Sequence, residues 1–168
     1  MANHLQESVT TAVNQTIAKT VECVRGLSEE VIRWKPSEEE WSIMQIIAHV
    51  AEAIPYWVGE IRSIINNPNE AWGRGITDEV RIHTVSEENI NSLTVNGVLE
   101  ELHTATEQVT KLLQEITDEQ LSMTAPCRNP RFEGKTAEFI VNHLIVEHAE
   151  KHYGQIQRNL GKWEAKVN

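Results

Sequence analysis

Two histidines near the end of the sequence have a spacing that suits metal binding. His148 and His152 are four residues apart, which places them about 40° apart on one face of a helix. That face is otherwise largely apolar and also carries Val141, Leu144, Ile145 and Gln155. Both imidazoles are therefore expected to point into the protein. Histidines at positions i and i+4 can share one metal ion, as they do in the HExxH helix.

A third histidine, His49, is distant in sequence but has a similar setting. On a helical projection it lies within about 60° of three inward residues, Ile46, Ala53 and Tyr56. Together, His49, His148 and His152 would form a set of three imidazole ligands with open coordination positions, which is typical of catalytic zinc sites. The alternative is that each is an ordinary core histidine, and each buried imidazole would then need its own hydrogen-bond partner.

The other four histidines are less suited to this site. His143 lies about 140° from His148 on the same helix, so one ion cannot contact both. His103 falls at the edge of an apolar helical face, where it could at best contact a metal-binding residue without binding the metal itself. His4 and His83 fall in terminal and connecting segments, where we expect them to be solvated.

Metal ligands need rigid elements to hold them, and the sequence predicts four. Apolar residues recur at spacings of three and four, which predicts amphipathic helices over residues 5–24, 42–65, 94–116 and 136–160. No stretch of the sequence resembles a strand. The predicted fold is therefore all-α, a single domain over residues 1–168 that forms an antiparallel four-helix bundle.

The second predicted helix, which carries His49, has a clear start. Ser42 followed by Gln45 predicts a capping box, and Trp41 is placed to pack on Ile46 across it. Pro55 lies inside this helix and should kink it, because proline lacks a backbone donor.

Residues 66–93 have no clear period, and they predict a long connection that could include a short helical turn. A second irregular stretch covers residues 124–135. His49 lies about seven residues into its helix and His148 about twelve into its own. We therefore expect the fourth helix to start lower in the bundle than the second.

The composition excludes several classes of function. The formal net charge is −10 and Lys and Arg do not cluster, which argues against a nucleic-acid partner. No stretch approaches the ~20 apolar residues that span a bilayer. The N-terminal residues lack the pattern of a signal peptide, so we expect a cytoplasmic protein. The two cysteines, Cys23 and Cys127, form no metal or redox motif.

Two segments resemble the signatures of the DinB-like (YfiT-like) metalloenzyme superfamily. Residues 26–52, GLSEEVIRWKPSEEEWSIMQIIAHVAE, are similar to its opening signature, and residues 148–156, HAEKHYGQI, to its closing one. The resemblance implies a four-helix bundle in which His49, His148 and His152 bind zinc, nickel or a related divalent ion. It also implies a homodimer, and an activity that is either a thiol-dependent S-transfer or a metal-dependent hydrolysis.

Three functions follow as hypotheses. The first is a thiol-dependent S-transferase for small electrophiles, because an ion held by neutral imidazoles favours a thiolate ligand. The thiol would be a low-molecular-weight cosubstrate, and Arg74 or Arg81 would form ion pairs with its charged groups. The alternative is that both arginines are simply solvated. The second is a hydrolase that uses bound water, with Glu52 as the base unless Glu52 simply faces solvent. The third is a non-catalytic, dimeric metal-binding module.

The homodimer prediction also has a basis in the residues. Phe139 and Val146 fall on the face of the fourth helix opposite the histidines, where they cannot fill the bundle interior. They would contact a second copy of the chain, or else the connection over residues 66–93 would cover them.

Overall fold

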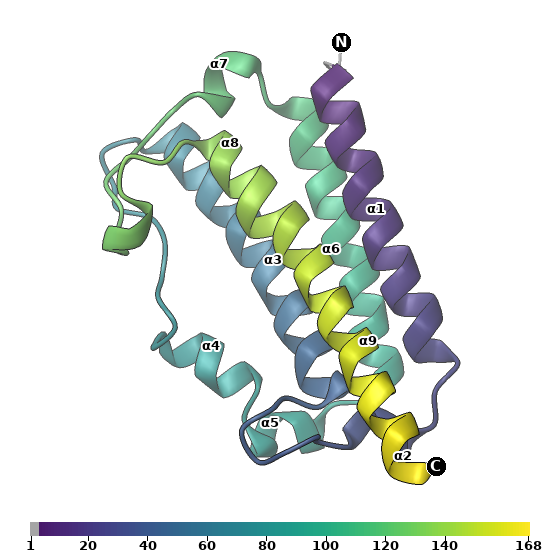
Figure 1. The fold of residues 1–168 in the computed structure, drawn as a ribbon. Coiled ribbons are helices and arrows are strands. Elements are labelled where there is room, and N and C mark those ends of the chain that lie inside the picture. The colour runs from purple at the N-terminus through teal and green to yellow at the C-terminus, as the bar shows by residue number, and fades with distance from the viewer. Residues whose placement is uncertain (1–3) are drawn as a thin grey trace.

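The computed structural model describes residues 4–168, in which four long helical segments pack side by side (Figure 1). Three of them are single helices, α1 (His4–Arg25), α3 (Ile43–Asn66) and α6 (Val95–Glu115). The fourth segment is continuous but composite, and consists of α8 (Ala137–Phe139), a π-helix (Ile140–Glu147) and α9 (His148–Val167). The predicted all-α four-helix bundle is confirmed.

Side-chain caps start the long helices where the sequence predicted. The hydroxyl of Ser42 accepts the N–H of Gln45 at 3.1 Å, and the Gln45 carbonyl oxygen accepts the N–H of Ser42 at 2.9 Å. This is the predicted capping box, and it satisfies two backbone donors that the first helical turn leaves unpaired. Thr94 and Thr136 also cap α6 and α8, but each accepts only one backbone N–H and forms no capping box. The helix α3 remains one helix through Pro55.

The interior of the bundle is filled by aliphatic side chains from all four segments. The helix α3 contributes most of them, because it is buried on nearly every side along its first three turns. Fully buried examples from the four segments are Val13, Ile47, Ile54, Leu102, Leu113, Ile140 and Ile145. The histidines of interest are embedded in this core, and its packing positions them.

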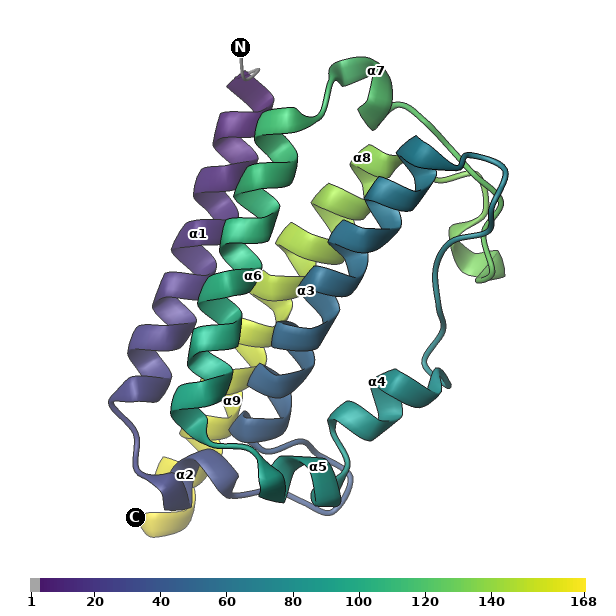
Figure 2. The same ribbon diagram turned by 180° about the vertical axis from the view of Figure 1, so that it is seen from behind.

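The directions of the helices differ from the antiparallel arrangement that the sequence suggested. Gln6 near the start of α1 donates to the carbonyl of Ile116 just after α6, so these two helices are antiparallel. Arg62 and Glu115 pair at the last turns of α3 and α6, so these neighbours run parallel. The prediction of an antiparallel bundle was therefore wrong for α3 and α6 (Figure 2).

A long connection makes this parallel arrangement of α3 and α6 possible. It returns the chain from one end of the bundle to the other, and α4 lies alongside α3 on the way (Figure 1, Figure 2). The segment is the long connection that the sequence predicted, and it contains two short capped helices where one short helical turn was considered, α4 (Glu79–Thr84) and α5 (Glu87–Ser92). Asp78 and Ser86 are their N-caps.

The start of this connection is anchored by Trp72, which is fully buried. Its indole N–H donates to the carbonyl of Ala125 at 3.1 Å, and its backbone forms a β-bridge with Cys127. The stretch over residues 124–135 is thereby held against the connection. Two further short helices, α2 (Glu29–Arg33) and α7 (Asp118–Leu121), follow α1 and α6 respectively.

The fourth segment extends beyond the predicted end at Leu160, to Val167. Its outer residues Phe139 and Val146 are half-buried rather than exposed. Phe132, from the preceding stretch, packs on Phe139 with ring centroids 5.6 Å apart. Phe132 therefore covers part of Phe139.

Within the described part of the chain, every helix is too short or too polar to cross a bilayer. Residues 1–3, which begin the segment used to predict a cytoplasmic protein, lie outside the described residues.

Candidate metal centre

The three predicted metal-binding histidines meet inside the bundle. His49 lies in the second turn of α3, and His148 and His152 lie in the first two turns of α9. These helices are antiparallel, as the hydrogen bond from Asn159 late in α9 to the carbonyl of Trp41 before α3 shows. The expectation that the fourth helix starts lower than the second assumed parallel helices and was wrong. Antiparallel packing brings the second turn of α3 beside the start of α9.

The histidines meet through one type of atom, the Nε2 nitrogen. His148 Nε2 lies 3.2 Å from His49 Nε2 and 2.9 Å from His152 Nε2. One ligand atom from each histidine lies within 4.8 Å of the other two. His49 and His152 are buried, with exposed fractions of 3 % and 8 %, and His148 is partly buried.

This arrangement fits a divalent metal ion. Nitrogens bound at about 2.0–2.1 Å to one zinc ion are about 2.9–3.4 Å apart, and the two contacts to His148 fall in that range. The Nδ1 atoms of His49 and His148 are buried and have no hydrogen-bond partner. These two are therefore not ordinary core histidines satisfied by the protein, and the arrangement supports metal binding.

The second ring nitrogen of His152 is fixed by a neighbour. Its Nδ1 lies 2.8 Å from the carbonyl oxygen of Gln155, which can only accept, so Nδ1 carries the proton. The lone pair of His152 is then on Nε2, directed at the cluster. Such an orienting contact is a regular feature of metal-bound histidine. The sequence had placed Gln155 on the inward face, but its role as a partner of His152 was missed.

The cluster is electrically neutral. Burial lowers the pKa of His49 to about 2 and that of His148 to about 3, and the other positive charges nearby add to both effects. Burial likewise lowers the pKa of His152, although its bond to Gln155 opposes the change. All three imidazoles are therefore unprotonated at neutral pH, which is the form that binds a metal ion.

Trp41 forms one wall of the site. Its ring centroid lies 5.1 Å from that of His49, and its ring stacks on that of His152 at 6.2 Å and an interplanar angle of 15°. Arg81 of α4 lies on this indole, 5.8 Å from its centroid. From the sequence, Trp41 was expected only to pack on Ile46 across the start of the helix. Its closeness in sequence to His49, eight residues later, was the signal that could have placed it at the site.

Glu52, the candidate base, is engaged elsewhere. Its two carboxylate oxygens accept hydrogen bonds from Arg74 at 2.7 and 2.6 Å. The Arg74 side chain is only 7 % exposed, and it lies over the ring of Tyr56 at 3.9 Å. Glu52 is thus the ion-pair partner of Arg74, with a side chain that is 23 % exposed, and not a free carboxylate in solvent. The same pairing removes Arg74 as a free partner for a substrate charge.

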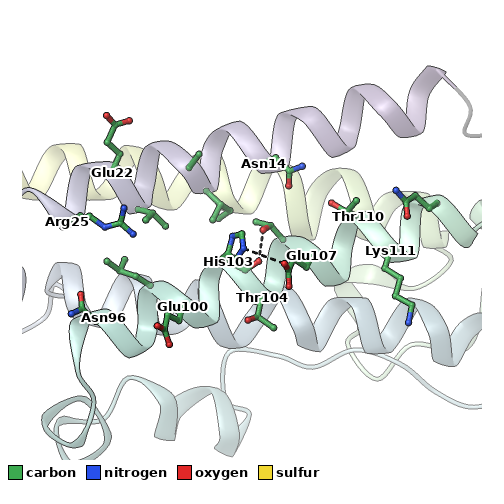
Figure 3. A pocket seen from close by; sticks show the side chains of 16 residues that line it. Asn14, Glu22, Arg25, Asn96, Glu100, His103, Thr104, Glu107, Thr110 and Lys111 are labelled. Atoms are coloured by element: carbon green, nitrogen blue, oxygen red, sulfur yellow. Dashed lines mark hydrogen bonds and ion pairs between the residues drawn. The ribbon is translucent and has the colours of Figure 1, made fainter.

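The remaining histidines lie outside the cluster. His143 is exposed and bonds to Glu147 at 2.7 Å. His103 is exposed, pairs with Glu107 at 3.4 Å, and lines a groove of about 1540 Å³ between α1 and α6 (Figure 3). This groove contains none of the three clustered histidines, so it is separate from the candidate metal centre. His4 and His83 are exposed, as expected.

Comparison with known proteins agrees with this geometry. The family model of the DinB superfamily matches residues 12–156. The chain belongs to the DinB superfamily. No curated protein sequence matches it. Among solved structures, this DinB protein is similar to YfiT from Bacillus subtilis, with a TM-score of 0.81 and 16 % sequence identity over 98 % of this chain and 90 % of that one. YfiT is described as a probable metal-dependent hydrolase with an unusual four-helix bundle topology, and at this identity the likeness shows a shared fold.

Proposed function

We propose that His49, His148 and His152 hold one divalent metal ion, zinc or nickel, and that the protein uses it as a thiol-dependent S-transferase for small electrophiles. The observation that carries the proposal is the convergence of three neutral Nε2 atoms with no carboxylate among them. An ion held by three neutral imidazoles keeps its full positive charge, and it lowers the pKa of a thiol that binds to it.

The residues of the chain prepare the site for such a ligand. Burial keeps the imidazoles neutral, and Gln155 holds His152 in the correct tautomer. Trp41 packs against one side of the cluster, beside His49 and His152. A low-molecular-weight thiol is needed, because neither cysteine belongs to the cluster. Cys127 lies at the bridge to Trp72, and Cys23 lies on α1 next to Gln157.

A metal-dependent hydrolase is the second candidate, and the description of YfiT favours it. This reaction benefits from a carboxylate base near the metal-binding residues. Glu52 is the residue expected in that role, and its bidentate pairing with Arg74 occupies both of its oxygens. We therefore rank the transferase first.

Metal analysis of purified variants tests the site. Changing His49, His148 or His152 to Ala should remove most of the bound metal, while the helical circular dichroism signal persists. The matched control is His143→Ala, which changes an exposed histidine of the same segment and should retain the metal. Stoichiometric metal in both His148→Ala and His152→Ala would exclude this ligand set.

Turnover assays separate the functions. Metal-loaded protein is incubated with a generic electrophile and several thiols, and metal-stripped protein serves as the control. The transferase predicts conjugation that requires both metal and thiol. Ester cleavage without thiol dependence would identify the hydrolase instead, and metal binding with neither reaction would identify a non-catalytic module.

A further inference from the structure

The charge around the histidine cluster is opposite to that of the whole protein. The chain has a formal net charge of −10, but the carboxylates near the cluster are engaged. Glu52 is paired with Arg74 through two hydrogen bonds. Asp78 lies 3.5 Å from Arg74 and also accepts the backbone N–H of Arg81 as the N-cap of α4. Of the two arginines on this side of the cluster, Arg74 has carboxylate partners and Arg81 has none.

Within residues 4–168, no carboxylate lies within ion-pair distance of Arg81. Its side chain donates one hydrogen bond, from a terminal nitrogen to the carbonyl of Ile76 at 3.1 Å. The residue is half-buried, and this burial together with the charge of Arg74 lowers its pKa. Arginine nevertheless stays protonated in proteins, so a partly desolvated and unpaired positive charge remains.

Arg81 is also held in a fixed place relative to the histidines. Its helix α4 starts five residues after Arg74, which is tied to Glu52 on α3, the helix that carries His49. The guanidinium lies over Trp41, and the same indole contacts His49 and His152. A ligand at the cluster therefore lies within reach of Arg81.

We propose that Arg81 is the specificity-determining residue of the site, and that it binds the carboxylate of a small molecule whose other end reaches the three histidines. Guanidinium and carboxylate form paired, charge-assisted hydrogen bonds, and Arg81 has donors free for them. The inference rests on the proposed metal site and adds a substrate class to it. The accepted thiol, or the molecule it attacks, carries a carboxylate.

A matched pair of ligands tests this preference. Zinc-loaded protein is titrated by calorimetry with 3-mercaptopropionate and with its neutral amide, which has the same size and the same thiol. Wild-type protein should bind the acid more tightly. Arg81→Gln should weaken binding of the acid about tenfold or more and leave binding of the amide unchanged.

The control variant is Lys151→Gln. Lys151 is exposed on α9, yet its charge also influences His148 and His152, so its removal tests for a general effect of charge. It should leave the preference for the acid over the amide intact. An equal preference in wild type and Arg81→Gln, or an equal loss in both variants, would overturn the proposal.

Failure of the metal site itself gives a different result, because neither thiol would then bind to the wild-type protein in a zinc-dependent way. In that case the metal-free protein is titrated with propionate and followed by NMR. Shifts at Arg81 and Trp41 that vanish in Arg81→Gln would support carboxylate binding without metal. Their absence in the wild type would reject it.

Discussion

Each histidine of the cluster directs its Nε2 atom at the shared centre, but the Nδ1 atoms are not all in the same environment. His152 has Gln155 as a partner, whereas the Nδ1 atoms of His49 and His148 are buried without one. A buried donor without a partner is destabilising by about 1–3 kcal/mol. The cluster therefore destabilises the metal-free protein locally. A bound ion would offset part of this cost, because it would replace the close contacts between the three Nε2 atoms with bonds to the metal.

The pH dependence of the metal-free protein follows from the same burial. The pKa of His49 is about 2 and that of His148 about 3 in the folded state, against an ordinary value of 6.5 when unfolded. At a pH between the folded and unfolded pKa values, only the unfolded chain binds protons at these two histidines. The free energy of unfolding is therefore highest above about pH 6.5 and falls as the pH decreases. Each histidine contributes about 1.4 kcal/mol per pH unit to this slope.

Urea unfolding of metal-free protein at several pH values between 4 and 7 measures this effect. His49→Gln should show a shallower loss of stability with acid than the wild type, whereas the exposed His143→Gln should follow the wild type. Curves of equal slope for wild type and His49→Gln would contradict the assignment.

The three histidines could be predicted from sequence because each lies on a long helix whose apolar period fixes its direction. The partners of Glu52 and Arg81 could not. Arg74 is 22 residues from Glu52, in a connection without periodicity, so nothing local indicated that the two would pair. Arg74 and Arg81 were both considered as charge partners, but only the structure shows that Arg74 is paired with carboxylates and Arg81 is not.

At the scale of elements, helix starts were predicted well because caps are local. The hydroxyl of Ser42, only three residues from the amide it accepts, is an example. The composite fourth helix was not predicted. A π-helix has wider turns than the period used for the projection, so residues before His148 are rotated relative to those after it. The direction of α6 relative to α3 was also missed. The spacing of apolar residues predicts each helix, but it contains no information about how the connection between the two helices runs.

The capping box of α3 is expected to matter more for stability than the other caps. Ser42→Ala should lower the free energy of unfolding by about 1–2 kcal/mol, because it removes the acceptor for the buried N–H of Gln45. Thr94→Ala at the exposed cap of α6 is the matched variant and should have a smaller effect. Chemical unfolding of both proteins measures the difference, and an equal or smaller loss for Ser42→Ala would refute this ranking.

At the scale of the whole molecule, the homodimer stays a prediction. The face of the fourth segment offers Val146 and a Phe139 that Phe132 partly covers. The most exposed large apolar side chains lie elsewhere, at Ile76 and Val80 of the connection. Sedimentation velocity at micromolar concentration should show a dimer that Val146→Glu dissociates and Val80→Glu does not. A monomeric wild type would argue against the dimer, and dissociation by Val80→Glu alone would move the interface to the connection.

The separation of the ligands along the chain has a consequence for folding kinetics. His49 and His148 are 99 residues apart, and they meet only after the long connection has formed and the fourth segment has packed antiparallel to α3. Closing so long a loop precedes the contact, so the cluster is completed late and is largely absent from the transition state. We expect metal to slow unfolding while leaving the folding rate nearly unchanged. The ion would thus prolong the lifetime of the native protein without hastening its formation.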